Sequence, residues 1–158
     1  MLETEEDMLA YFDVDFGHAI NATYIKSGVS TAIKIIFVHK SLAEAFNKGL
    51  AEKIESLKVG MMWDSGVQIT PLPEPNKPAY LKELIEDAKM HGAAVLNPHG
   101  GENFKSIFFP ALLYPVNSKM KVWHEEQFGP VVPVVPFDDL RTPIDYIHES
   151  SHGQQVAI

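Results

Sequence analysis

The chain has 158 residues, of which 46% are hydrophobic and 22% are charged, and its formal net charge at pH 7 is −8. This length is typical of one domain and is sufficient to bury a core without disulfides or a metal. The acidic balance argues against nucleic acids and anionic membranes as partners. Because the chain contains no cysteine, it has no disulfide framework, no thiolate metal site and no thiol nucleophile.

The first third of the chain predicts a helix, a strand and a second helix. Apolar residues at every fourth position predict a helix over 13–24. A run rich in β-branched residues over 32–39 predicts a buried central strand. Ser41 and Glu44 have the spacing of a capping box, which predicts that an amphipathic helix begins there and ends near Lys58.

A proline-rich stretch over 61–77 predicts an irregular loop, and a helix is expected after it. Pro78 suits the first turn of that helix, and Gly92 suits the position just past its end. Three further apolar runs predict strands, over 93–96, 107–113 and 131–135. Thr142 and Pro143 predict the start of a short helix with Ile144 and Ile147 facing inward. The aromatic residues expected in the core are Trp63, Trp123, Phe108 and Phe109.

The alternation of strands and helices predicts the fold class. Crossover helices between strands imply a mostly parallel sheet that is covered on both faces. We therefore expect an α/β fold, a three-layer α/β/α sandwich, in a single domain over residues 1–158.

Three stretches of the chain resemble segments of aldehyde dehydrogenases. Residues 27–32, Ser-Gly-Val-Ser-Thr-Ala, resemble the nucleophile segment of that family, Gly-Gln-x-Cys-Thr-Ala. Residues 58–72 resemble the family's Val-Gly-x-Pro turn and the segment after it. Residues 125–131, Glu-Glu-Gln-Phe-Gly-Pro-Val, match the motif Glu-Glu-x-Phe-Gly-Pro-Val, the most specific of the three. Order and spacing agree over nearly the whole chain, and the resemblance looks closest to the non-phosphorylating glyceraldehyde-3-phosphate dehydrogenase branch.

The departures from the family pattern affect the expected chemistry. The resemblance implies that Ser30 stands at the position of the catalytic cysteine, while Ser27 and Gly28 replace the Gly-Gln pair. Val29 stands where the glyceraldehyde phosphate branch has an arginine. The Glu-Leu-Gly-Gly segment that supplies the family's general base, and its dinucleotide-binding domain, have no counterpart in the chain. The resemblance thus implies an excised catalytic domain with an incomplete NAD(P) site, for which we expect no cofactor.

The same resemblance implies roles for Glu126 and Phe128. It places Glu126 against the nicotinamide ribose beside the nucleophile, with Phe128 close by. His124 lies two residues before Glu126, and in an extended segment both would share one face. Ser30, His124 and Glu126 are therefore the candidate catalytic residues of a Ser-His-Glu arrangement. The alternative histidines, which are otherwise most simply solvated or hydrogen-bonded bystanders, are His18, His148 and His152.

No metal site is expected. His148 and His152 are four residues apart, but no third ligand follows at a known spacing. No window is long enough to span a bilayer, and the acidic first residues are unlike a signal peptide, which makes a cytoplasmic location the default expectation.

Three functional hypotheses follow. The leading one is a domain derived from an aldehyde dehydrogenase, without dehydrogenase activity, that is an engineered scaffold. The second is an engineered serine hydrolase that performs esterase-like acyl transfer with Ser30 and a histidine base, since a serine hydroxyl needs a neighbouring base. The third is a natural pseudoenzyme that acts as an interaction module. The expected partners are a small ester or aldehyde, and a second copy bound through the face left by the missing domain.

Overall fold

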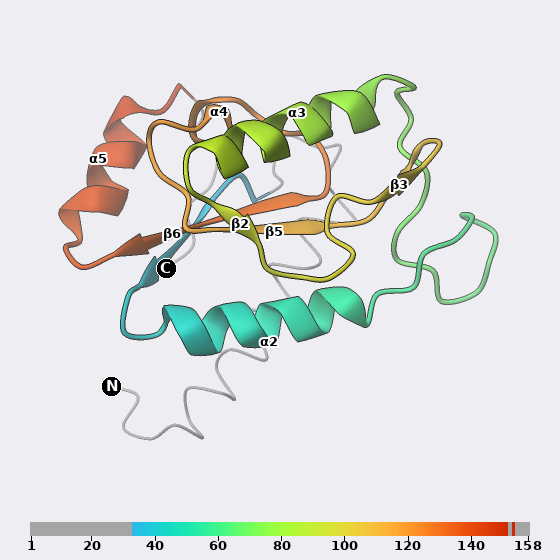
Figure 1. Ribbon diagram of the computed structural model, residues 1–158, viewed down its shortest axis with the longest axis horizontal. Helices are drawn as coiled ribbons and strands as arrows, with labels where there is room; N and C mark the ends of the chain where they lie inside the picture. Colours follow the sequence, from blue (N-terminus) through green and yellow to red (C-terminus); the bar gives the residue numbers. More distant parts are fainter. Residues whose placement is uncertain (1–32, 152, 154–158) are drawn as a thin grey trace.

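The computed structural model describes residues 33–151 and 153 (Figure 1). In chain order, its elements are β1 (Ile36–His39), α2 (Ala43–Glu55), α3 (Lys77–Met90), β2 (Ala94–Val95), β3 (Asn103–Phe104), β4 (Ile107–Phe108), β5 (Ala111–Tyr114), α4 (Lys121–His124), β6 (Val131–Phe137) and α5 (Arg141–Glu149). The helix predicted over 13–24 and the segment that contains Ser30 lie outside the described residues. None of the helices in the described ranges has the length and apolar character that a bilayer span requires.

Strand β6 lies in the middle of a four-stranded sheet with the order β1-β6-β5-β2. It pairs in parallel with β1 on one side and with β5 on the other, while β2 is antiparallel to β5. The first five residues of β6 are all buried. A strand that is covered on both faces reads as a continuous apolar run, and that is why its sequence predicted a buried strand correctly.

Two apolar clusters cover the two faces of the sheet. The first joins α2 to the sheet through Phe46, Leu50 and Ile54, which are all buried against β6 and β5 side chains. The second joins α3 and α4 to the other face through buried residues that include Leu81 and Val122. Figure 1 shows α2 on one side of the sheet and α3 and α4 on the other. The predicted three-layer α/β/α architecture is therefore confirmed.

Two predicted helix starts are wrong by one or two residues. Helix α2 begins at Ala43 after an N-cap residue, Leu42, that makes no side-chain cap bond. Ser41 does not cap the helix, because its hydroxyl bonds to the His39 ring nitrogen Nδ1 at 2.7 Å. Helix α5 begins at Arg141, whose N–H donates to Asp139 Oδ1 at 2.9 Å.

Three side chains predicted to be buried lie at the surface. Trp63, expected in the core, is 73% exposed in the long loop before α3. Ile144 and Ile147 are 49% and 47% exposed, because α5 contacts the sheet layer through Tyr146. The Tyr146 ring lies 5.2 Å from that of Phe37 and 5.1 Å from that of Trp123. Helical spacing alone could not identify which face of so short a helix is covered.

Candidate functional site

The segment from Glu125 to Val131 forms a loop between α4 and β6, and we call it the motif loop. Helix α4 ends at His124, and Glu125 already has extended backbone angles, φ −88° and ψ 142°. The chain therefore leaves the helix abruptly and enters the central strand at Val131. Glu125 and Glu126 thus come shortly before the start of β6 in the chain.

Tyr80 on α3 holds the beginning of the motif loop. Its hydroxyl lies 3.1 Å from Glu125 Oε2 and 3.1 Å from the backbone oxygen of Glu126. Both neighbours are acceptors, so the phenolic proton is shared between them. Burial and the bond to Glu125 raise the pKa of Tyr80 to about 12. The hydroxyl therefore stays protonated and able to donate at neutral pH.

Gln127 anchors the middle of the loop from inside the protein. It is 4% exposed, and its Nε2 donates to the backbone oxygens of Lys34 at 2.9 Å and of Val131 at 3.1 Å. Lys34 lies four residues after Ser30 in the sequence and two before β1. The amide of Gln127 therefore fixes the loop to the stretch of chain that leads from Lys34 into β1.

Phe128 and Gly129 shape the end of the loop. Phe128 has a positive φ of 42°, which is uncommon for a residue other than glycine. The residue is 37% exposed, and the Lys77 ammonium lies 5.7 Å from the centre of its ring. A Cβ atom on Gly129 would lie 2.6 Å from Leu81 Cδ1, in the buried core. The absence of a side chain at residue 129 lets the loop pack directly on α3 while Phe128 turns outward.

Lys34 supplies a half-buried amine beside the motif loop. Its Nζ donates a short hydrogen bond to the backbone oxygen of Val122 in α4. Burial lowers the pKa of Lys34 to about 8, although the charges of Glu126 and Glu125 act in the opposite direction. Burial has the larger effect because the partner of the ammonium among the described residues is a neutral carbonyl.

Glu126 lies where three elements converge. Its charge favours the protonated state of Lys34, before β1, and of Tyr80 on α3. It also adds to the effect of burial in raising the pKa of Tyr146 on α5. The charge of one carboxylate thus raises the pKa values of an amine and of two phenols that belong to different parts of the chain.

His124 does not occupy the position that the sequence predicted. We expected an extended segment that contains both His124 and Glu126, and this is wrong because His124 is the last residue of α4. Its Nε2 lies 2.8 Å from the backbone oxygen of Ser118, at the surface. Ser30 lies outside the described residues, so the Ser-His-Glu arrangement stays a prediction.

The alternative histidines are distributed as follows. His148 is exposed on α5, and His18 and His152 lie outside the described residues. Over the described ranges, histidines, aspartates and glutamates form no group of three or more that could hold a metal ion.

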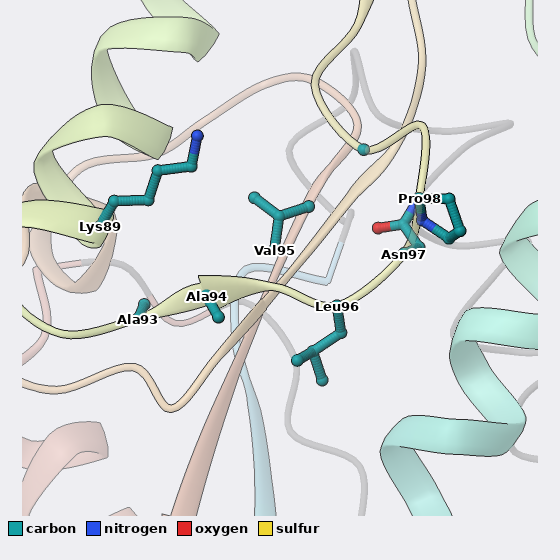
Figure 2. Close-up of a pocket in the computed structure, with 8 residues that line it drawn as sticks. Lys89, Ala93, Ala94, Val95, Leu96, Asn97 and Pro98 are labelled. Atoms are coloured by element: carbon teal, nitrogen blue, oxygen red, sulfur yellow. The ribbon is translucent and has the colours of Figure 1, made fainter.

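A separate hollow lies along β2, the last strand in the order of the described sheet (Figure 2). It is lined by Lys89, Gly100 and the chain from Ala93 to Pro98. The polar atoms of Asn97 are used internally, because Nδ2 donates to the Pro110 oxygen at 2.8 Å and Oδ1 accepts from the Leu112 N–H at 2.9 Å. None of these residues belongs to the motif loop.

Three residues of the site could not be assigned from the sequence. Tyr80 was expected only as part of the apolar stripe of its helix, Gln127 stands at the variable position of the motif, and Lys34 interrupts an apolar strand pattern. The last feature is the one available signal, since a lysine within a buried strand pattern needs a partner or an altered pKa.

Comparison with known proteins decides the family. The model described as the aldehyde dehydrogenase family matches residues 12–158. The chain belongs to the aldehyde dehydrogenase family. This confirms the resemblance drawn from the three sequence segments.

The relatives are much longer enzymes. A 3,6-anhydro-alpha-L-galactose dehydrogenase of Vibrio sp. (strain EJY3) is 32% identical over 132 residues, which cover 79% of this chain and 27% of the relative. An NADP-dependent glyceraldehyde-3-phosphate dehydrogenase of Zea mays is 30% identical over 145 residues, which cover 88% of this chain and 28% of the relative. The crystal structure of an aldehyde dehydrogenase from Brucella melitensis biovar abortus 2308 superposes with a TM-score of 0.82 at 30% identity, covering 88% of this chain and 29% of that one. The chain thus spans under a third of their length.

The family implies a nicotinamide dinucleotide, and the described residues of this aldehyde dehydrogenase domain fit one part of it. A carboxylate such as Glu126 accepts hydrogen bonds from ribose hydroxyls, and the outward ring of Phe128 offers an apolar face. Glu126 and Phe128 are thus the described residues that would hold the ribose end of such a cofactor. When bound, that cofactor supplies the hydride acceptor for aldehyde oxidation.

Proposed function

We propose that this aldehyde dehydrogenase domain does not oxidise aldehydes and that it acts as a folded scaffold. The observation that carries the proposal is the serine at position 30, in the place of the family's cysteine, in a chain with no cysteine at all. The described residues nevertheless form a four-stranded sheet, two apolar clusters and hydrogen bonds that support the motif loop. Loss of the nucleophile together with retention of the fold favours a structural or binding role.

The chemistry of the two nucleophiles supports this proposal. A cysteine thiol with a pKa of about 8.5 is partly ionised at neutral pH and attacks carbonyls directly. A serine hydroxyl attacks only when a neighbouring base removes its proton. The histidine predicted for that purpose, His124, has its Nε2 bonded to the Ser118 oxygen. The described residues therefore offer no observation that favours the serine hydrolase over the scaffold.

Restoring the thiol tests the proposal. Wild type, Ser30→Cys and Ser30→Ala would each be treated with p-nitrophenyl acetate, and the acetylated residue would be located by peptide mass spectrometry. We expect an acetyl group at residue 30 only in Ser30→Cys, because the scaffold retains the position but not the nucleophile. Acetylation of Ser30 in the wild type, abolished in Ser30→Ala, would contradict the scaffold and support the hydrolase.

Two finer parts of the proposal need their own evidence. An engineered origin for Ser30 stays a prediction from the sequence, as does membership of the glyceraldehyde-3-phosphate dehydrogenase branch. Self-association of the domain also stays a prediction from the sequence and is part of the scaffold proposal. Sedimentation equilibrium measures it directly, and a monomer at all concentrations would remove this part.

A further inference from the structure

The Lys34 amine differs from three other lysines in the partner that it bonds. Lys40, Lys89 and Lys121 form ion pairs with Asp138, Glu86 and Glu83, respectively. Lys34 forms no ion pair with any of the described residues, and the partner of its Nζ is the neutral carbonyl of Val122. A neutral acceptor does not compensate a half-buried positive charge, so this environment favours the uncharged amine.

The surroundings of this amine resemble those of a reactive site. The backbone of Lys34 is held by Gln127 at 2.9 Å, so the side chain starts from a fixed point. Nζ bonds to the Val122 carbonyl in α4, and the charges of Glu125 and Glu126 in the motif loop act on its pKa against the effect of burial. Glu125 and Glu126 are the titratable groups of the motif loop that act on the amine. The charge of Glu126 also raises the pKa of Tyr80 on α3 and of Tyr146 on α5. A positioned amine whose environment favours the uncharged form suits reactions with carbonyl compounds.

We propose that Lys34 is a covalent attachment site for small neutral aldehydes, which condense with its ε-amine to form an imine. The amine nitrogen attacks the carbonyl carbon, and a C–N bond forms. The carbonyl oxygen then leaves with the two amine protons as water, so no oxidant, reductant or cofactor is required. Glu125 or Glu126 can relay the transferred proton, since carboxylates act as general acids and bases. One N–H of the neutral amine can bond to Val122 before attack, which leaves the lone pair free.

The lowered pKa of Lys34 sets the size of the effect. With a pKa of about 8, roughly one molecule in ten carries a neutral amine at about pH 7. For an ordinary lysine the fraction is below about one in a thousand. A lower pKa also weakens the nucleophile, so the rate advantage is smaller than the ratio of these fractions.

Reductive trapping tests the site in the intact chain. The wild-type protein would be incubated at about pH 7 with propionaldehyde and sodium cyanoborohydride, and each lysine's propylation rate would be followed by peptide mass spectrometry. We expect Lys34 to react about five-fold or more faster than Lys89, an ion-paired surface lysine. A smaller ratio would overturn the proposal.

Two controls separate the folded environment from the sequence around Lys34. The same measurement in urea must bring the two rates together, because unfolding removes the burial. Lys89→Arg must leave the fast site unchanged, whereas Lys34→Arg must remove it. The ratio of the Lys34 and Lys89 propylation rates is measured in the wild-type protein, so it does not depend on whether a variant folds. A small ratio in the wild type overturns the proposal regardless of the results with the variants. It is also independent of whether Ser30 is active, because propylation reports the amine alone.

Discussion

Gln127 Nε2 donates a hydrogen bond of 2.9 Å to the backbone oxygen of Lys34, and this bond joins the motif loop to the chain that enters β1. The two residues are 93 apart in the sequence. The same nitrogen donates to Val131 at the start of β6. One buried amide thus links the chain that enters β1 to the start of β6, next to Glu126 in the sequence.

Gln127→Glu should therefore destabilise the fold. A carboxylate cannot donate to the oxygens of Lys34 and Val131, and it would be buried at a position that is 4% exposed. We expect a loss of about 2 kcal/mol or more in the free energy of unfolding, measured by urea denaturation at neutral pH.

Gln68→Glu is the matched control for that substitution. Gln68 Oε1 accepts from the Lys58 N–H at 3.0 Å, and a carboxylate oxygen can accept the same bond at the exposed position. Its stability should change by less than about 0.5 kcal/mol. Equal effects of the two substitutions would contradict the anchoring role of Gln127.

Gly129→Ala should destabilise the protein by overpacking. The new Cβ would lie 2.6 Å from Leu81 Cδ1 and 2.9 Å from Cδ2, and Leu81 is fully buried. We expect a loss of about 1–3 kcal/mol in the free energy of unfolding. Gly153→Ala is the control, because a Cβ there meets nothing within 4 Å. An unchanged urea midpoint for Gly129→Ala would show that the loop does not pack closely on α3.

The sequence predicted the layers of the fold better than the details of the site. Strand β6 was predictable because burial on both faces gives a continuous apolar run. Helix α3 was predictable because a proline suits its first turn and a glycine suits the position just past its end. Tyr80 and Gln127 were not assignable, since their hydrogen bonds reach across 45 and 93 residues to atoms that no local pattern specifies. The prediction that His124 and Glu126 belong to one extended segment was wrong, because the short helix α4 ends at His124.

Tyr80 should make stability fall at alkaline pH. Its pKa is raised in the folded state to about 12 from an ordinary value near 10, so its neutral form stabilises the fold below about pH 10. This contribution is lost as the pH rises through 10 towards 12. Tyr80→Phe cannot ionise and should lose less stability over that range. The difference in tyrosinate absorbance between the two proteins measures the midpoint, and a midpoint near 10 would contradict the hydrogen bonds to Glu125 and Glu126.

Glu126→Gln should make Lys34 more reactive. The negative charge of Glu126 raises the pKa of Lys34, so its removal should lower that pKa below about 8 and increase the neutral amine at about pH 7. Propylation of Lys34 should then be faster than in the wild type. Glu102→Gln, which removes an exposed carboxylate beside His99, is the control and should have no effect on that rate. Slower labelling in Glu126→Gln would show that the carboxylate is needed mainly for proton transfer.

The most direct test of the proposed function is the reduction of NAD(P)⁺ by the purified chain in the presence of aldehydes, followed by the absorbance of the reduced nicotinamide. The test uses wild type and Ser30→Ala side by side, with both cofactors and several aldehydes. The proposal predicts no difference between the two proteins and no reduction above that of the buffer. Cofactor reduction by the wild type that disappears in Ser30→Ala would contradict it.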